Sequence, residues 1–156
     1  MKSFKKFLIE VFHPDFVSSI TDSGITTHTY ENNETGVQSF IHTKGDTAYW
    51  GFTVSGKEGI PTDVAPQNVP QELRRARLNT AFEHLAHFAK RNSNIENILY
   101  QTNEGERGDK NHSIFQAKWP AYQEKHEIDT NLVRVEKNPL GSPSPQKIIN
   151  MGYEII

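Results

Sequence analysis

Two histidines lie in neighbouring segments that alternate between polar and apolar residues. His28 and His42 hold equivalent positions in two predicted strands, so we expect both imidazoles on the face that carries Phe40 and Trp50. Imidazole titrates near neutral pH, and two of them can act as general acid and general base in phosphodiester cleavage. The pair predicts a histidine-dependent nuclease or phosphodiesterase. The alternative, which we favour, is two partly buried strand histidines without a catalytic role.

An arginine cluster lies in the first turns of a predicted long helix. Arg74, Arg75 and Arg77 are cations at the positive end of the helix dipole, where they are unfavourable unless an anion offsets them. This conflict favours a phosphate group, a nucleotide or an acidic partner surface as ligand. Screening by Glu72 or Asp63 is the alternative.

Two further candidates for ligand binding come from a polar loop and from the aromatic residues. Lys110 follows Gly105 and Gly108 in a segment that could hold an anion, although no phosphate-binding fingerprint is present. Trp50 is the aromatic residue we expect beside a ligand. At least three members of the aromatic set are expected in the core: Trp50, Tyr100, Phe115, Trp119 and Tyr122.

The metal-ligating residue types give no complete motif. His84 and His87 are three residues apart and Glu83 precedes them, whereas the zinc-protease helix requires histidines four apart with a glutamate after the first. The chain has no cysteine, so thiolate ligands are excluded. We therefore predict no metal and no cofactor, with His84 and His87 on a solvated helix face.

Composition sets the class of protein. A chain of 156 residues fits a single domain, 1–156, with one core. Lys and Arg number 17 against 19 Asp and Glu, so the net charge of -2 does not favour nucleic acid as a partner. The apolar run near the amino terminus, 7–9, is too short for a signal peptide or a membrane span. With no cysteine present, a cytoplasmic location is the default expectation.

These residues must be positioned by an α+β fold with a mostly antiparallel sheet. Period-two alternation predicts a three-stranded meander, and a run of i, i+3, i+4 apolar positions predicts one long helix packed on the sheet. Pro120 predicts two short helices that meet near Trp119, because proline is disfavoured inside a helix. The expected elements are an amphipathic helix within 1–16, strands 25–31, 37–43 and 47–55, the helix 70–91, a strand 94–102, the short helices, and strands at 132–136 and at the carboxyl end.

This order of elements is similar to that of the GNAT acyltransferases. In that family the loop and first turn before the long helix bind the pyrophosphate of acyl-coenzyme A through an Arg/Gln-x-x-Gly-x-Gly/Ala pattern. Arg74 matches the first position, but Arg77 and Asn79 replace the two glycines. The resemblance covers about 47–102. It implies an α+β sandwich and acyl transfer.

Three classes of function follow. The first is a small binding or inhibitor protein of the phage, mobile-element or toxin-immunity type, with a protein or a nucleotide-like ligand as partner and no membrane contact. It is favoured by the modest size, the near-neutral charge and the lack of a complete catalytic motif. A nuclease or phosphodiesterase using His28 and His42 and a divergent acyltransferase are the alternatives.

Overall fold

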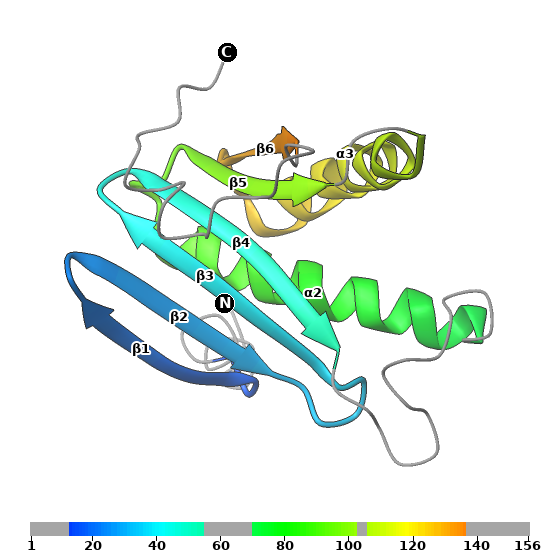
Figure 1. Ribbon diagram of the computed structural model, residues 1–156, viewed down its shortest axis with the longest axis horizontal. Helices are drawn as coiled ribbons and strands as arrows, with labels where there is room; N and C mark the ends of the chain where they lie inside the picture. The colour runs from blue at the N-terminus through cyan, green and yellow to red at the C-terminus, as the bar shows by residue number, and fades with distance from the viewer. Residues whose placement is uncertain (1–12, 55–69, 103–105, 137–156) are drawn as a thin grey trace, which may run out of the picture.

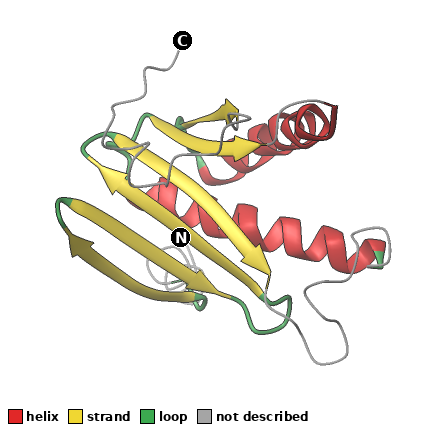
Figure 2. Ribbon diagram, in the orientation of Figure 1, coloured by secondary structure: helices red, strands yellow, loops and turns green. Residues whose placement is uncertain are grey.

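A computed structural model of the protein describes residues 13–54, 70–102 and 106–136. Within these ranges six strands form one mixed sheet in the order β1-β2-β3-β4-β5-β6, and helices α2 and α3 cover one of its faces (Figures 1 and 2). The predicted α+β class is confirmed. Neither of these two helices combines the length and the apolarity that crossing a bilayer requires. The predicted final strand and residues 1–12 of the predicted amino-terminal helix lie outside the described residues. Residues 13–16, the end of that predicted helix, form a turn and the first residue of a strand instead.

The first half of the sheet is an antiparallel meander. Its strands are β1 (Phe16–Asp22), β2 (Ile25–Glu31), β3 (Val37–Lys44) and β4 (Thr47–Val54). The last three confirm the predicted meander, whereas β1 was not predicted. The β1–β2 hairpin turns at Ser23 and Gly24, whose φ angles of 54° and 82° are both positive. A two-residue type I′ hairpin requires this combination.

Strand β1 forms one edge of the described sheet and contains a bulge. Phe16 is paired with Tyr30, but the next pair is Ser18 with Thr29, so Val17 is an extra residue. An extra residue in one strand bends it and increases its twist. Val17 and Ile20 are 53% and 63% exposed, so this edge strand places two apolar side chains on the surface.

The second half of the sheet is parallel. Its strands are β5 (Asn97–Thr102) and β6 (Asn131–Glu136). Helix α2 (Gln71–Arg91) precedes β5 in the chain, and helix α3 (Glu106–His126) precedes β6. Strand β5 runs parallel to β4, and β6 runs parallel to β5. A helix between two strands returns the chain to the same end of the sheet, so the next strand has the same direction. The antiparallel prediction is therefore confirmed only for the meander.

Strands β4 and β5 separate towards their carboxyl ends. The paired residues run from Thr47 with Asn97 to Trp50 with Tyr100. Among the described residues, no further pair of β4 and β5 follows Trp50 and Tyr100. Both strands continue, β4 to Val54 and β5 to Thr102, and their arrowheads diverge in Figure 1. The backbone edges that face each other there do not bond to one another.

Helix α2 is buried on two sides. It packs against β3 and β4 on one side and against α3 on the other. The predicted apolar stripe is confirmed by Phe82, Leu85 and Phe88, which are at most 1% exposed. The predicted solvated face is wrong, because His84 is 0% exposed and His87 is 6% exposed. The face of α2 that carries these imidazoles lies against the sheet and the turn before β1, where His84 contacts Ser39 and Asp15 and His87 contacts Tyr30. Buried imidazoles need such partners inside the protein.

Helix α3 is one continuous helix that contains Pro120, so the prediction of two short helices is wrong. Pro120 itself is exposed, whereas Trp119 is 3% exposed and donates from Nε1 to the Thr130 carbonyl at 2.9 Å. Packing of one face of the helix thus offsets a proline cost of about 3 kcal/mol. The expected polar loop before this helix is also wrong over residues 106–111, which are helical.

Candidate functional site

The two strand histidines lie on opposite faces of the sheet. In the β2–β3 register, His28 is paired with Ile41 and His42 with Thr27. The His28 ring packs against Phe88 of α2, with ring centroids 5.0 Å apart. His42 lies on the other face, where its Nδ1 is 2.9 Å from Oγ1 of Thr27. The expectation of a shared face is wrong, since pairing differs by one residue from the assumed register.

The pKa shifts of His28 and His42 also argue against an acid–base pair. Burial lowers the pKa of His28, and the charges of Arg91 and His42 lower it further. Burial lowers the pKa of His42 as well. An acid–base pair needs one protonated and one neutral member near pH 7, but both shifts favour the neutral form. The structure therefore brings together no His28–His42 site.

The three arginines of the predicted cluster do not lie together: two line a groove, and the third bonds to the turn after β2. Arg74 and Arg75 are exposed and line a groove between α2 and α3. Arg77 points elsewhere, because its Nε donates to the Thr35 carbonyl at 3.2 Å. Lys110 is exposed on α3, one turn before Ile114, and is not among the residues that line the groove. Trp50 is 1% exposed in the core, so it cannot contact a ligand at the surface.

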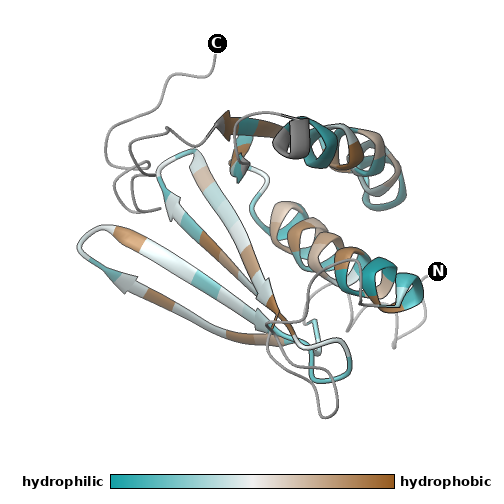
Figure 3. Ribbon diagram, turned by 45° about the vertical axis from the view of Figure 1, so that its right-hand side comes forward, coloured by the Kyte–Doolittle hydropathy of each residue, from teal (hydrophilic) through white to brown (hydrophobic). Residues whose placement is uncertain are grey.

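The groove between the helices has a volume of about 360 Å³, and the described residues that line it include cations but no acidic residue. Of the two carboxylates expected to screen the arginines, Glu72 lies in the first turn of α2 and Asp63 lies outside the described residues. Lys118 of α3 contributes the third cation, and its Nζ donates to Oδ1 of Asn79 at 2.8 Å. Leu78 and Ile114 supply apolar surface, and Ile114 is 36% exposed. Figure 3 shows that hydrophilic residues dominate the first turns of α2. The groove thus combines positive charge with two aliphatic contacts.

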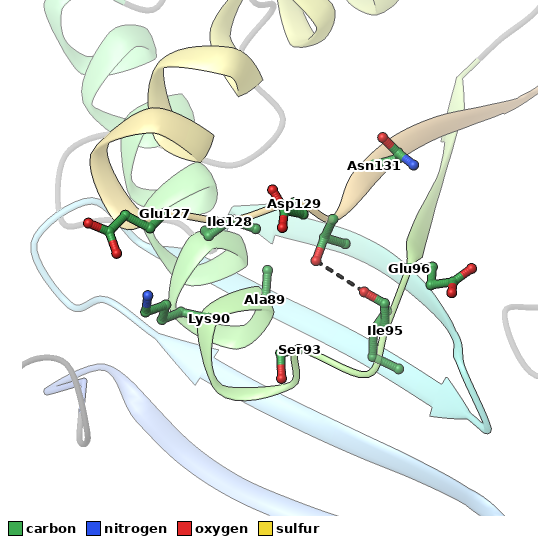
Figure 4. A pocket seen from close by; sticks show the side chains of 10 residues that line it. Ala89, Lys90, Ser93, Ile95, Glu96, Glu127, Ile128, Asp129 and Asn131 are labelled. Atoms are coloured by element: carbon green, nitrogen blue, oxygen red, sulfur yellow. Dashed lines mark hydrogen bonds between the residues drawn. The ribbon is translucent and has the colours of Figure 1, made fainter.

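A larger cavity of about 500 Å³ lies where β5 and β6 begin (Figure 4). Its lining includes Glu96, Glu127, Asp129 and Lys90. In Figure 4 the carboxylates of Glu127, Asp129 and Glu96 are spread around the rim rather than aimed at one point. Because the charged groups of the described lining do not converge, these residues offer no arrangement that would hold a reacting group or an ion.

A histidine-rich cluster between the sheet and α2 is the most concentrated group of polar side chains within the described residues. His13, Asp15 and His84 each present one ligand atom, and these atoms lie within 4.8 Å of one another. The Asp15 carboxylate accepts from Nε2 of His84 at 2.8 Å and from Nδ2 of Asn32 at 3.0 Å. Burial lowers the pKa of both His13 and His84, against the opposite influence of Asp15.

The same cluster extends towards the aromatic core. Tyr30 stacks on His84 with ring centroids 5.0 Å apart, and its hydroxyl lies 2.8 Å from Nδ1 of His87. Burial raises the pKa of Tyr30, so its hydroxyl stays protonated. The His13 ring meets the rings of His84 and His87 edge-on, at 5.5 and 5.4 Å. The His13 ring therefore contacts two imidazoles of α2, between that helix and the sheet.

Ser39, His84 and Asp15 form a hydrogen-bonded chain in the order found in serine hydrolases. The Ser39 hydroxyl lies 2.8 Å from Nδ1 of His84, and Nε2 donates to Asp15. Ser39 and His84 are both 0% exposed, so no substrate can reach the hydroxyl oxygen. In a hydrolase triad, moreover, Nε2 contacts the serine and Nδ1 the aspartate. The chain of bonds is thus not a nucleophilic site.

The sequence carried one overlooked signal for this cluster. His13 and Asp15 are separated only by Pro14, and the Phe16 N–H donates to the His13 carbonyl at 3.1 Å. This closes a β-turn with proline at its second position, a place that suits the fixed φ of proline. The turn holds the imidazole and the carboxylate side by side.

Comparisons of the chain with protein-family models, with curated proteins and with solved structures found no match.

Proposed function

We propose that the protein acts by binding and recognises a phosphorylated or acidic segment of a macromolecular partner in the groove between α2 and α3. The observation that carries the proposal is the lining: Arg74, Arg75 and Lys118 lie beside Leu78 and Ile114, and no acidic residue is among the described residues of the groove. Neither arginine makes an ion pair with a described residue. Two guanidinium groups are therefore available for bidentate contact with a phosphate or carboxylate.

The end of α2 adds to the positive field of the groove. Pro70 occupies the N-cap position and provides no side-chain hydrogen bond to the helix. Pro70 therefore offers no side-chain acceptor to the first-turn N–H groups, and the helix dipole adds a partial positive charge. Glu72 in the first turn offsets part of this positive charge, and Arg74 and Arg75 add to it. An anion would relieve it.

The aliphatic contacts favour a peptide-like ligand over a free phosphate ion. Leu78 and Ile114 leave apolar surface in the groove, and an apolar side chain beside an acidic or phosphorylated residue would cover it. This function belongs to the binding or inhibitor class. It needs no catalytic group.

The test measures the affinity of labelled peptides by fluorescence anisotropy. A phosphopeptide with a hydrophobic residue next to the phosphate should bind the wild type, and its affinity should fall as salt rises. The Arg74→Gln/Arg75→Gln variant should bind about tenfold or more weakly, because charge-assisted hydrogen bonds are lost. Lys90→Gln/Lys125→Gln is the matched control, since it removes the same charge from two exposed lysines outside the groove. Equal affinity in the two double variants would refute the proposal.

A divergent acyltransferase is the second candidate, and the separation of β4 from β5 favours it. Ligands in sheets with parallel strands bind at the carboxyl ends, where neighbouring strands part. The ladder between β4 and β5 stops at Trp50–Tyr100, although both strands continue. Arg77 and Asn79, in place of two glycines, argue against pyrophosphate binding of the GNAT kind.

Acyl transfer is testable without background, because the chain has no cysteine. Incubation with acetyl-coenzyme A and a set of amines should release free coenzyme A thiol if the protein is a transferase. A thiol reagent would then detect the product alone. No thiol release and no calorimetric binding of coenzyme A are the results expected from a binding protein.

A further inference from the structure

Two imidazoles and one carboxylate converge from segments that are far apart in the sequence. His13 and Asp15 belong to the turn before β1, and His84 lies in the middle of α2. One ligand atom from each lies within 4.8 Å of the other two. We propose that His13, Asp15 and His84 form a binding site for a divalent transition-metal cation of the zinc type. The proposal is independent of the groove between α2 and α3.

The separations of the ligand atoms suit a metal ion after small movements. Zinc bonds of about 2.1 Å in a tetrahedral arrangement place neighbouring ligand atoms about 3.4 Å apart. Nε2 of His84 lies 2.8 Å from Oδ2 of Asp15, and Nδ1 of His13 lies 3.9 Å from the same oxygen. The first separation is short and the second is long, and the remaining pair, His13 and His84, lies within 4.8 Å. Metal binding would therefore draw His13 towards the other two ligands.

Second partners already hold the ligands in place. Nδ1 of His84 is hydrogen-bonded to the Ser39 hydroxyl at 2.8 Å, and the Asp15 carboxylate accepts from Asn32. Metal-bound histidines typically use their other ring nitrogen in this way. With a metal on Nε2, the proton of His84 moves to Nδ1 and is donated to Ser39. Both ligands therefore keep a hydrogen bond in the metal-bound form.

The chemistry of the ligands selects the class of ion. Two imidazole nitrogens with one carboxylate oxygen suit Zn²⁺ and related transition metals, whereas Ca²⁺ and Mg²⁺ prefer oxygen ligands throughout. Three protein ligands leave the fourth zinc position for water or another small ligand. Access to it is from the side of His13 and Asp15, whose side chains are each 16% exposed, because His84 is fully buried.

Metal binding would replace existing bonds of modest strength. The bond from Nε2 of His84 to Asp15 would be exchanged for two bonds to the ion. If His13 binds through Nδ1, it also gives up the 3.0 Å hydrogen bond that it accepts from the Asp15 backbone N–H. A hydrogen bond inside a protein replaces one to water, so its net contribution to stability is small beside that of a zinc–imidazole bond.

The experiment uses the full chain after treatment with a chelator that is then removed. Isothermal titration with Zn²⁺ should show one ion per chain, and Co²⁺ should give visible absorption bands of a nitrogen- and oxygen-ligated low-symmetry site. His13→Ala and Asp15→Asn should each lower the zinc affinity by about 100-fold or more, since a direct ligand counts for more than the 10–100-fold of an outer partner. Ser39→Ala should lower it by about 10–100-fold through His84 alone.

His42→Gln is the matched control, because His42 is a part-buried strand histidine on the other face of the sheet. It should leave the zinc affinity and the cobalt spectrum unchanged. Circular dichroism confirms that each variant is folded before the titration, and His13→Ala removes the ligand that is least tied to the core. Absence of saturable binding by the wild type, or equal affinity in the wild type and His13→Ala, would overturn the proposal.

Discussion

Oδ2 of Asp15 lies 2.8 Å from Nε2 of His84, across 69 positions of sequence. This bond ties the turn that precedes β1 to the buried centre of α2. Because His84 is fully buried, its N–H group has no water to replace the carboxylate. The bond is therefore a structural requirement of the protein even when no ligand is present.

Replacement of Asp15 should destabilise the protein, and the loss should be larger when the new side chain offers no hydrogen-bond acceptor to His84. Asp15→Ala leaves a buried N–H group without its acceptor, at a cost of about 1–3 kcal/mol. Asp15→Asn keeps one oxygen acceptor and should cost less. Urea unfolding of both variants in the presence of a chelator measures the two free energies. Equal losses would show that water or another group replaces the carboxylate.

Truncation in the middle of α2 should be among the most costly changes. Leu85 is 0% exposed, and Leu85→Ala should lower the unfolding free energy by about 2–5 kcal/mol. Ile20→Ala is the control, because Ile20 is 63% exposed and should cost less than about 0.5 kcal/mol. Similar losses in the two variants would mean that the α2 stripe is not the core.

Acid should weaken the fold in part through His42. Burial holds the pKa of His42 below its ordinary value, so the unfolded chain takes up the proton first as pH falls. The stabilisation is complete above the unfolded pKa of about 6.5 and is lost as the pH falls towards the lower folded value. His42→Gln should therefore show a shallower decline in unfolding free energy between pH 8 and pH 5. Parallel declines in wild type and variant would contradict this assignment.

Removal of the proline in α3 should stabilise the protein. Pro120 is exposed and lies inside a continuous helix, where it removes a backbone hydrogen bond. Pro120→Ala restores an N–H donor for the carbonyl of Gln116, and a gain of up to about 3 kcal/mol is expected. Thermal unfolding followed by circular dichroism measures it. An unchanged or lower melting temperature would indicate that the helix geometry depends on proline.

Local patterns predicted most of the elements but not the contacts that make the sites. The strands at 25–31, 37–43 and 47–55 and the helix at 70–91 follow from period and turn residues, and the structure confirms them to within a few residues. The faces on which His28 and His42 lie depend on the register of β2 and β3, and a one-residue shift moves a side chain to the other face. The burial of His84 depends on β3 and on the turn before β1, which supply its partners Ser39 and Asp15. No local pattern encodes either.

The histidine cluster illustrates the same limit. His84 was expected in water because its neighbours on the helix are polar, yet its partners Ser39 and Asp15 come from distant segments. Separations of 45 and 69 residues lie beyond any helical or strand period. The Pro14 turn was the local clue, since it fixes an imidazole beside a carboxylate before the rest of the fold is known.

The extra residue in β1 has a consequence for self-association. Among the described strands β1 has a neighbour on one side only, and its exposed backbone groups could pair with another chain. The bulge at Val17 bends the start of this strand away from a regular ladder. A second molecule would therefore find only the stretch from Ser18 to Asp22 in regular geometry. An irregular edge of this kind hinders intermolecular sheet growth at the strand that carries the exposed side chains of Val17 and Ile20.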